Sequence, residues 1–191
     1  MRLAFIQGCN MHGLHRQTGV TLVELIFTVA ILATLVSISL PALANLVQSS
    51  HARSARGALS TSLALARMNA IARNTQVTVC PSANQNDCTS DIWWQRGWIV
   101  FVDTNRNGRR DTDEIVLEAV DAQPGAAIAT TAGRMFSSFR GDGGSPGTNL
   151  TFTLCDRRGP AKATTLVINN GGRVRAGVPS STQSASTCAA L

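Results

Sequence analysis

The sequence predicts an α+β protein in which one long N-terminal helix packs on an antiparallel β-sheet domain. Three observations predict this fold. An apolar run from Val20 to Leu40 contains a single charged residue, Glu24. Apolar residues then recur at helical spacing as far as about residue 73. From Gln76 onward, short β-type segments alternate with turns rich in Gly, Pro, Asn and Asp.

The apolar run is the predicted membrane segment. About 20 apolar residues are enough to span a bilayer as a helix, and we assign residues 20–41, which end at Pro41, to this segment. Acids are rare and costly inside such a helix, so Glu24 needs a partner or a function. Residues 1–19 carry Arg and His but no acid, which favours a cytoplasmic location for this end.

Residues 42–74 are expected to continue the helix as an amphipathic half. An apolar stripe on this half should pack on a sheet, and its members are Leu59, Leu63, Ala66 and Ala70. The arginines of this half are expected elsewhere on the helix surface, on a solvated face: Arg53, Arg56, Arg67 and Arg73.

Residues 75–191 form the predicted globular β domain. The expected strands are Gln76–Cys80, Trp98–Val102, Glu114–Val120, Met135–Phe139, Leu150–Cys155, Thr164–Ile168 and Arg173–Val178. The tail Ser180–Thr187 is rich in Ser and Thr and is expected to be mobile unless Cys188 anchors it. The domain also holds three tryptophans, which are expected to fill the core: Trp93, Trp94 and Trp98.

Four of the five cysteines follow the apolar run: Cys80, Cys88, Cys155 and Cys188. An even set beyond a membrane anchor predicts two disulfides. Cys80 and Cys88 bracket a short polar loop, which favours a local bond and leaves Cys155 with Cys188, although four cysteines allow three pairings. A zinc site is disfavoured, because there is no paired CxxC and His51 lies on the helix.

The segment from Asp103 to Glu114 has the spacing of a calcium loop, with Gly at the sixth position. Its oxygen-bearing residues are Asp103, Asn105, Asn107, Asp111 and Glu114. In a helix–loop–helix calcium site the loop lies between two helices, whereas strand-like sequence flanks this segment. Its three arginines, Arg106, Arg109 and Arg110, would also repel a cation. We therefore expect no metal here but a β connection that hydrogen-bonds its own backbone, with calcium binding as the alternative.

The composition points to a non-enzyme without a cofactor. There is no phosphate-binding glycine loop, and after Gly19 no serine or cysteine has a plausible histidine partner, because His51 is the one histidine there. The net charge of +6 falls to +4 without Arg2 and Arg16, and all but one of the basic residues are arginine. Arginine offers a fixed fork of donors that suits phosphate.

A candidate phosphate-binding hairpin lies near the C-terminal end. Asn170-Gly171 is a strong hairpin-turn signal. On the strand that follows, Arg173 and Arg175 are two residues apart and share one face, about 7 Å apart along the strand. From Arg134 onward there are seven basic residues and two acids. Three further basic residues would extend the patch: Arg157, Arg158 and Lys162. The alternative is a solvated hairpin face.

The start of the apolar run resembles the cleavage site of type IV pilins and pseudopilins, which reads Gly, a hydrophobic residue, then Thr-Leu-x-Glu. The resemblance implies that a prepilin peptidase removes residues 1–19 after Gly19. It implies that Val20 becomes an N-methylated N-terminus, and that Glu24 pairs with the N-terminal amine of a neighbouring subunit.

The β domain is similar to the FimT/FimU–GspH branch of minor pilins and pseudopilins. This resemblance is carried by Cys80-Pro81-Ser82, Gly97–Asp103, Phe152–Gly159 and Gly172–Arg175. It implies an inner-membrane anchor, a periplasmic C-terminal domain, and assembly with other pilins into a pilus or pseudopilus. Gly172, Arg173 and Arg175 match a GRxR motif that FimT-like proteins use on double-stranded DNA in natural transformation. The alternative is a type II secretion pseudopilin or a pilus-tip adaptor that binds no DNA.

Overall fold

The computed structural model describes residues 19–147 and 150–191, so the predicted leader, apart from Gly19, lies outside the described residues. The chain divides into two compact units, one ending at Pro41 and the other spanning Ala42–Leu191. The helix α1 (Leu22–Arg73) contains Pro41 and continues through it rather than stopping and resuming. Its first turn is capped by Thr21, whose hydroxyl accepts a hydrogen bond from the Glu24 backbone N–H (3.3 Å).

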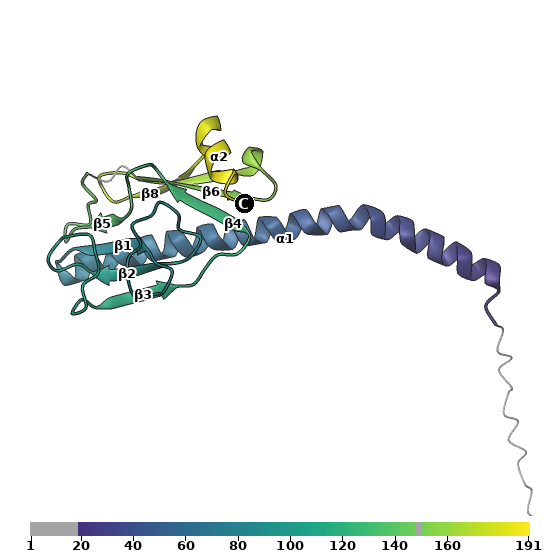
Figure 1. Ribbon diagram of the computed structural model, residues 1–191, viewed down its shortest axis with the longest axis horizontal. Coiled ribbons are helices and arrows are strands. Elements are labelled where there is room, and N and C mark those ends of the chain that lie inside the picture. The colour runs from purple at the N-terminus through teal and green to yellow at the C-terminus, as the bar shows by residue number, and fades with distance from the viewer. Residues whose placement is uncertain (1–18, 148–149) are drawn as a thin grey trace, which may run out of the picture. The chain divides into compact units, whose positions relative to one another are not determined.

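The β domain is built from two four-stranded antiparallel sheets rather than one (Figure 1). The first sheet has the order β3-β2-β1-β5, and its strands are β1 (Val77–Pro81), β2 (Trp98–Val102), β3 (Val116–Val120) and β5 (Ser137–Phe139). The second has the order β4-β6-β7-β8, and its strands are β4 (Ala126–Thr130), β6 (Leu150–Asp156), β7 (Thr164–Ile168) and β8 (Val174–Gly177). A 3-10 turn, η1 (Pro160–Lys162), joins β6 to β7.

Three strand predictions are too long, and one strand was not predicted. Glu114, Met135 and Arg173 lie outside β3, β5 and β8, which they were expected to begin. The strand β4 has the sequence AAIAT, and its alanines have little β propensity. It forms because its five residues pair in register with β6, from Ala126 opposite Asp156 to Thr130 opposite Phe152.

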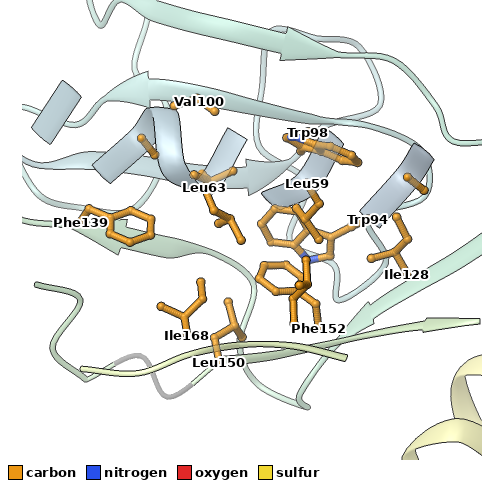
Figure 2. Close-up of a cluster of buried hydrophobic side chains, with 14 of the residues drawn as sticks. Leu59, Leu63, Trp94, Trp98, Val100, Ile128, Phe139, Leu150, Phe152 and Ile168 are labelled. Atoms are coloured by element: carbon orange, nitrogen blue, oxygen red, sulfur yellow. The ribbon is translucent and has the colours of Figure 1, made fainter. Parts of the chain in front are cut away.

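One face of the amphipathic half of α1 is buried against residues of both sheets, as its apolar stripe predicts. Figure 2 shows Leu59 and Leu63 between Trp98 and Val100 of β2 and the side chains of the second sheet. The indole Nε1 of Trp98 donates to the Ser62 hydroxyl (2.9 Å), so the most buried face of the helix also satisfies its polar atoms. The second sheet contributes Ile128, Leu150, Phe152 and Ile168 to this cluster.

The loop closed by the Cys80–Cys88 disulfide covers the outer face of the first sheet. Ile99 and Phe101 alternate with the helix-facing residues of β2 and pack with Cys80, and every residue of β2 is therefore buried. Cys80 is bonded to Cys88, and Cys155 to Cys188, the pairing that the spacing favours.

The C-terminal tail is ordered as a helix, α2 (Ser181–Cys188), where a mobile segment was expected in the absence of an anchor. A capping box begins it, with reciprocal hydrogen bonds between Ser180 and Gln183. The Cys155–Cys188 bond holds its end against β6. The tail therefore has both a local reason to be helical and a covalent anchor.

Candidate functional site

The N-terminal unit presents an uncovered apolar surface. Its large apolar side chains from Val20 to Leu40 are all at least 49% exposed, and α1 is the one described helix long and apolar enough to cross a membrane. Such a surface requires a bilayer or neighbouring helices around it. Gly19 has open space around it, with no atom within 4 Å of a built Cβ. Glu24 has no ion-pair partner among residues 19–147 and 150–191, and within this chain its backbone serves the capped first turn of α1.

The turn between β7 and β8 differs from the predicted one. Asn169 and Arg173 close it, through an N–H to C=O bond of 3.2 Å, and leave a three-residue loop. Gly172 has a left-handed φ of +70°, whereas Gly171 does not. This is a turn followed by a left-handed residue, a common three-residue hairpin connection. The glycine of the GRxR motif is therefore the residue on which the turn depends.

Gly172 is also required by packing. It is buried, and a Cβ built on it would lie 2.0 Å from the backbone oxygen of Gly143. Arg67 of α1 closes the same junction, because its Nε donates to the Gly143 oxygen (2.9 Å) and its Nη2 to the Gly171 oxygen (3.3 Å). Arg67 thus fastens the turn to the helix and is not on the solvated face where it was expected. No sequence signal marks it, since its partners lie 76 and 104 residues away.

Arg173 and Arg175 are presented to solvent at a sheet edge. Arg173 immediately precedes β8 rather than lying on it, and its N–H donates to the Asn169 side chain (3.0 Å). Arg175 pairs with Val167, and β8 is the outermost strand of its sheet. Both arginines are exposed, and neither guanidinium has a hydrogen-bond or ion-pair partner within residues 19–147 and 150–191. Two free cations therefore follow one tight turn.

Unlike Arg173 and Arg175, Arg158 has an ion-pair partner, Asp156. Its Nη2 lies 2.7 Å from Asp156 Oδ2, its Nε 2.9 Å from Oδ1, and its backbone N–H also bonds that carboxylate. Burial raises the pKa of Asp156, but the hydrogen bonds and charge of Arg158 outweigh burial and hold that pKa below its ordinary value. The hydrogen bond that the Arg158 side chain donates to Asp156 raises the pKa of Arg158. This ion pair cancels most of the charge that Arg158 would offer to a phosphate.

The remaining predicted site residues lie apart from the hairpin arginines. Arg157 and Lys162 are exposed, and Lys162 ends η1, just before β7. Lys162 precedes Val167, the partner of Arg175, by five residues, which is about 17 Å at about 3.3 Å per residue. The structure therefore separates the predicted basic patch into two clusters at opposite ends of β7.

The ion pair between Asp156 and Arg158 predicts an acid-sensitive contribution to stability. The folded-state pKa of Asp156 lies below the ordinary value of 3.8, so ionised Asp156 stabilises the fold. This contribution is complete above about pH 5 and is lost as the pH falls through the lowered folded-state pKa. We expect Asp156→Asn to be less stable than wild type near neutrality, with a difference that shrinks in acid. Urea unfolding of the full chain in detergent from about pH 6 to about pH 2.5 measures it.

Asp113→Asn is the matched control for that experiment, because Asp113 is exposed and has no ion-pair partner in the described ranges 19–147 and 150–191. The difference in free energy of unfolding between Asp113→Asn and wild type should stay small at every pH. If Asp156→Asn and Asp113→Asn behave alike, the ion pair does not stabilise the fold.

The calcium-like loop directs its oxygens to its own backbone. Asp103 is fully buried and accepts hydrogen bonds from the N–H groups of Asn107 (3.1 Å) and Gly108 (3.0 Å). Glu114 accepts from the N–H of Thr104 (2.7 Å), and its second oxygen from the N–H of Asp111 (3.1 Å). Over the described part of the chain, no group of three or more His, Cys, Asp or Glu side chains is placed to hold a metal ion. These contacts match the self-bonded β connection that the sequence favours.

Comparison with known proteins places the chain in a family. The family described as type II transport protein GspH matches residues 55–172, and the prokaryotic N-terminal methylation motif matches residues 14–40. The match to the first family ends at Gly172, one residue before Arg173. A search of curated proteins finds no match.

Two solved structures match this chain. The type IV minor pilin FimU of Pseudomonas aeruginosa has a TM-score of 0.53 and 19% identity, covering 73% of this chain and 93% of FimU. The minor pseudopilin EpsH from the Type 2 Secretion System of Vibrio cholerae has a TM-score of 0.48 and 14% identity, covering 68% of this chain and 98% of EpsH. The FimU likeness supports the fold, a long N-terminal helix with an antiparallel two-sheet β domain. Since the family match spans more than half of the sequence and follows an N-terminal methylation motif, the chain belongs to the GspH family of type IV minor pilins and pseudopilins.

Proposed function

We propose that this chain is a non-enzymatic minor pilin that enters a type IV pilus and binds double-stranded DNA through its β7–β8 hairpin. A prepilin peptidase cleaves it after Gly19, and α1 anchors it in the inner membrane with the β domain in the periplasm. Arg173 and Arg175 then contact the DNA backbone without reading sequence, during uptake of DNA for natural transformation.

One observation carries the DNA part of the proposal. Arg173 and Arg175 are exposed beside a turn that Gly172 and Arg67 hold in place, and no partner within the described residues neutralises them. A guanidinium presented on a fixed backbone loses less conformational freedom when it binds phosphate than one on a mobile loop, although the cost of ordering its side chain remains. The support from Gly172 and Arg67 therefore favours a binding surface over an ordinary solvated face.

The second candidate is a type II secretion pseudopilin or a tip adaptor that primes filament assembly and binds no DNA. The description of the matching family as a type II transport protein favours it. Both candidates use the same N-terminal helix, so the hairpin is where they differ.

Fluorescence anisotropy with a labelled DNA duplex separates the two candidates. The full mature chain in non-ionic detergent is compared with Arg173→Gln/Arg175→Gln over a range of salt concentrations. We expect wild type to bind with an affinity that falls with salt, and the variant to lower the slope of log K against log salt by about 0.9 for each lost contact. Two unrelated duplex sequences should bind alike.

Arg106→Gln/Arg109→Gln is the matched control, because it removes the same charge from two exposed arginines of the calcium-like loop. Its affinity and slope should stay close to those of wild type. Absence of salt-dependent binding by wild type would favour the secretion or adaptor role.

A further inference from the structure

A second basic surface lies between α1 and the second sheet. Two neighbouring hollows share Arg53 and Arg56 of the helix. The larger, of about 360 Å³, is otherwise lined by Gly57, Ser60, Leu166, Val174 and Ala176. The smaller is otherwise lined by Ala52, Leu154, Arg158, Lys162 and Thr164. We call the two hollows together the α1–β8 groove.

The charge of the α1–β8 groove has one sign. Four basic side chains line it, and no acidic side chain does. Arg158 is already bound to Asp156, so the available cations are Arg53, Arg56 and Lys162. An unbroken positive lining of this kind attracts a polyanion from solution.

The guanidinium of Arg53 is fixed in place by two hydrogen bonds within α1. Its Nε donates to the backbone oxygen of Ser49 (3.1 Å) and its Nη2 to the Ser49 hydroxyl (2.8 Å). An arginine has five N–H donors, so most of them stay available while the guanidinium is fixed in place. Ser49 itself is buried, which makes it a rigid support.

The strand β8 connects the groove to the hairpin. Successive residues of a strand point to opposite faces. Val174 and Ala176 line the groove, and Arg175 between them therefore points to the opposite face of the same strand. Because β8 is an outermost strand, its outer edge is not paired with another strand. A single ligand lying along this edge can therefore contact both faces of β8.

We propose that the α1–β8 groove is a second phosphate-binding site, in which Arg53, Arg56 and Lys162 hold the backbone of the same DNA duplex that the hairpin binds. The inference rests on the proposed function of the hairpin. The larger hollow, with Arg53 and Arg56, is lined by Val174 and Ala176, the immediate neighbours of Arg175, whereas Lys162 lies at most about 17 Å from Val167, the partner of Arg175. A B-DNA strand carries one phosphate per roughly 3.4 Å, so a duplex lying along the β8 edge reaches Lys162 within about five phosphate steps of the hairpin.

The test measures salt-dependent duplex binding by the full mature chain in non-ionic detergent. The groove variant is Arg53→Gln/Arg56→Gln/Lys162→Gln, and the charge-matched control is Arg96→Gln/Arg106→Gln/Arg109→Gln, whose arginines are exposed and line neither hollow. We expect the groove variant to reduce the slope of log K against log salt by about 0.9 for each of three contacts, with the hairpin intact. The control should leave the slope close to that of wild type.

Four results would overturn the inference, and they are distinguishable. If the groove variant keeps the wild-type slope while the hairpin variant loses binding, the groove is not a DNA site and the hairpin proposal stands. If groove variant and control lower the slope equally, net charge is the cause. If the groove variant binds DNA normally but no longer associates with partner pilins, the groove receives an acidic protein surface. Failure of wild type to bind removes both proposals together.

Discussion

Replacing Gly172 by alanine is expected to destabilise the β domain by about 2–5 kcal/mol. A non-glycine residue in the left-handed region costs about 1–2 kcal/mol, and forced overpacking costs about 1–3 kcal/mol. Both apply here, since φ is +70° and the new Cβ would lie 2.0 Å from the Gly143 oxygen. Relief requires the turn to separate from Gly143, which disturbs the junction where Arg67 bonds the oxygens of both Gly143 and Gly171. Denaturant unfolding of the full chain, followed by tryptophan fluorescence, measures the loss.

Two other glycines serve as controls for this substitution. Gly171→Ala meets only the Asn169 side chain at 3.5 Å, so its effect should stay below about 1 kcal/mol. Gly133 has a φ of +78° with nothing within 4 Å, so Gly133→Ala isolates the backbone strain, which is about 1–2 kcal/mol. An effect of Gly172→Ala no larger than that of Gly171→Ala would show that the turn tolerates a side chain.

Removing the Cys155–Cys188 disulfide is expected to lower stability by about 3–4 kcal/mol. The bond closes a separation of 33 residues, and the chain entropy that it removes from the unfolded state grows with the length of the closed loop. It also anchors α2 against β6, so the variant Cys155→Ala/Cys188→Ala should lose helix at the C-terminal end. Denaturant unfolding gives the stability, and amide hydrogen exchange reports on Ser181–Cys188.

The other disulfide is an internal reference for this prediction. Cys80–Cys88 closes a separation of only 8 residues, so Cys80→Ala/Cys88→Ala should cost about 2–3 kcal/mol. Each pair joins one buried and one half-buried cysteine, so the side-chain burial terms nearly cancel in the comparison. A larger loss from the short loop than from the long one would contradict the entropic explanation.

Elements with a local signal could be predicted from the sequence. The stripe of Leu59, Leu63, Ala66 and Ala70 has helical spacing, and these side chains are buried as expected. The α2 helix also has a local signal, the Ser-x-x-Gln capping box at Ser180, although the composition of the tail suggested mobility. No such signal exists for β4, whose alanine-rich sequence becomes a strand only beside β6.

The basic residues show the limit of reasoning from sequence spacing. Arg157, Arg158 and Lys162 were expected to extend the hairpin patch because they are basic and lie in the same half of the chain. In the fold, Arg158 is paired with Asp156, and Lys162 lines a groove with two arginines from α1. Spacing along a strand predicts which side chains share its face, but it does not predict which partner a distant loop or helix supplies.

The sequence alone determined the anchor helix, the cleavage and methylation motif and the α+β class, because each depends on short-range periodicity or on a motif of a few residues. It favoured one cysteine pairing among three, and the structure has that pairing. Only the tertiary structure decided the role of Gly172, the contacts of Arg67 and the division of the cations into two clusters. The physical reason is that these features depend on atoms brought together from distant segments. The contact that excludes a side chain at Gly172 is with Gly143, and the bonds that fix the turn come from a helix about one hundred residues earlier in the chain.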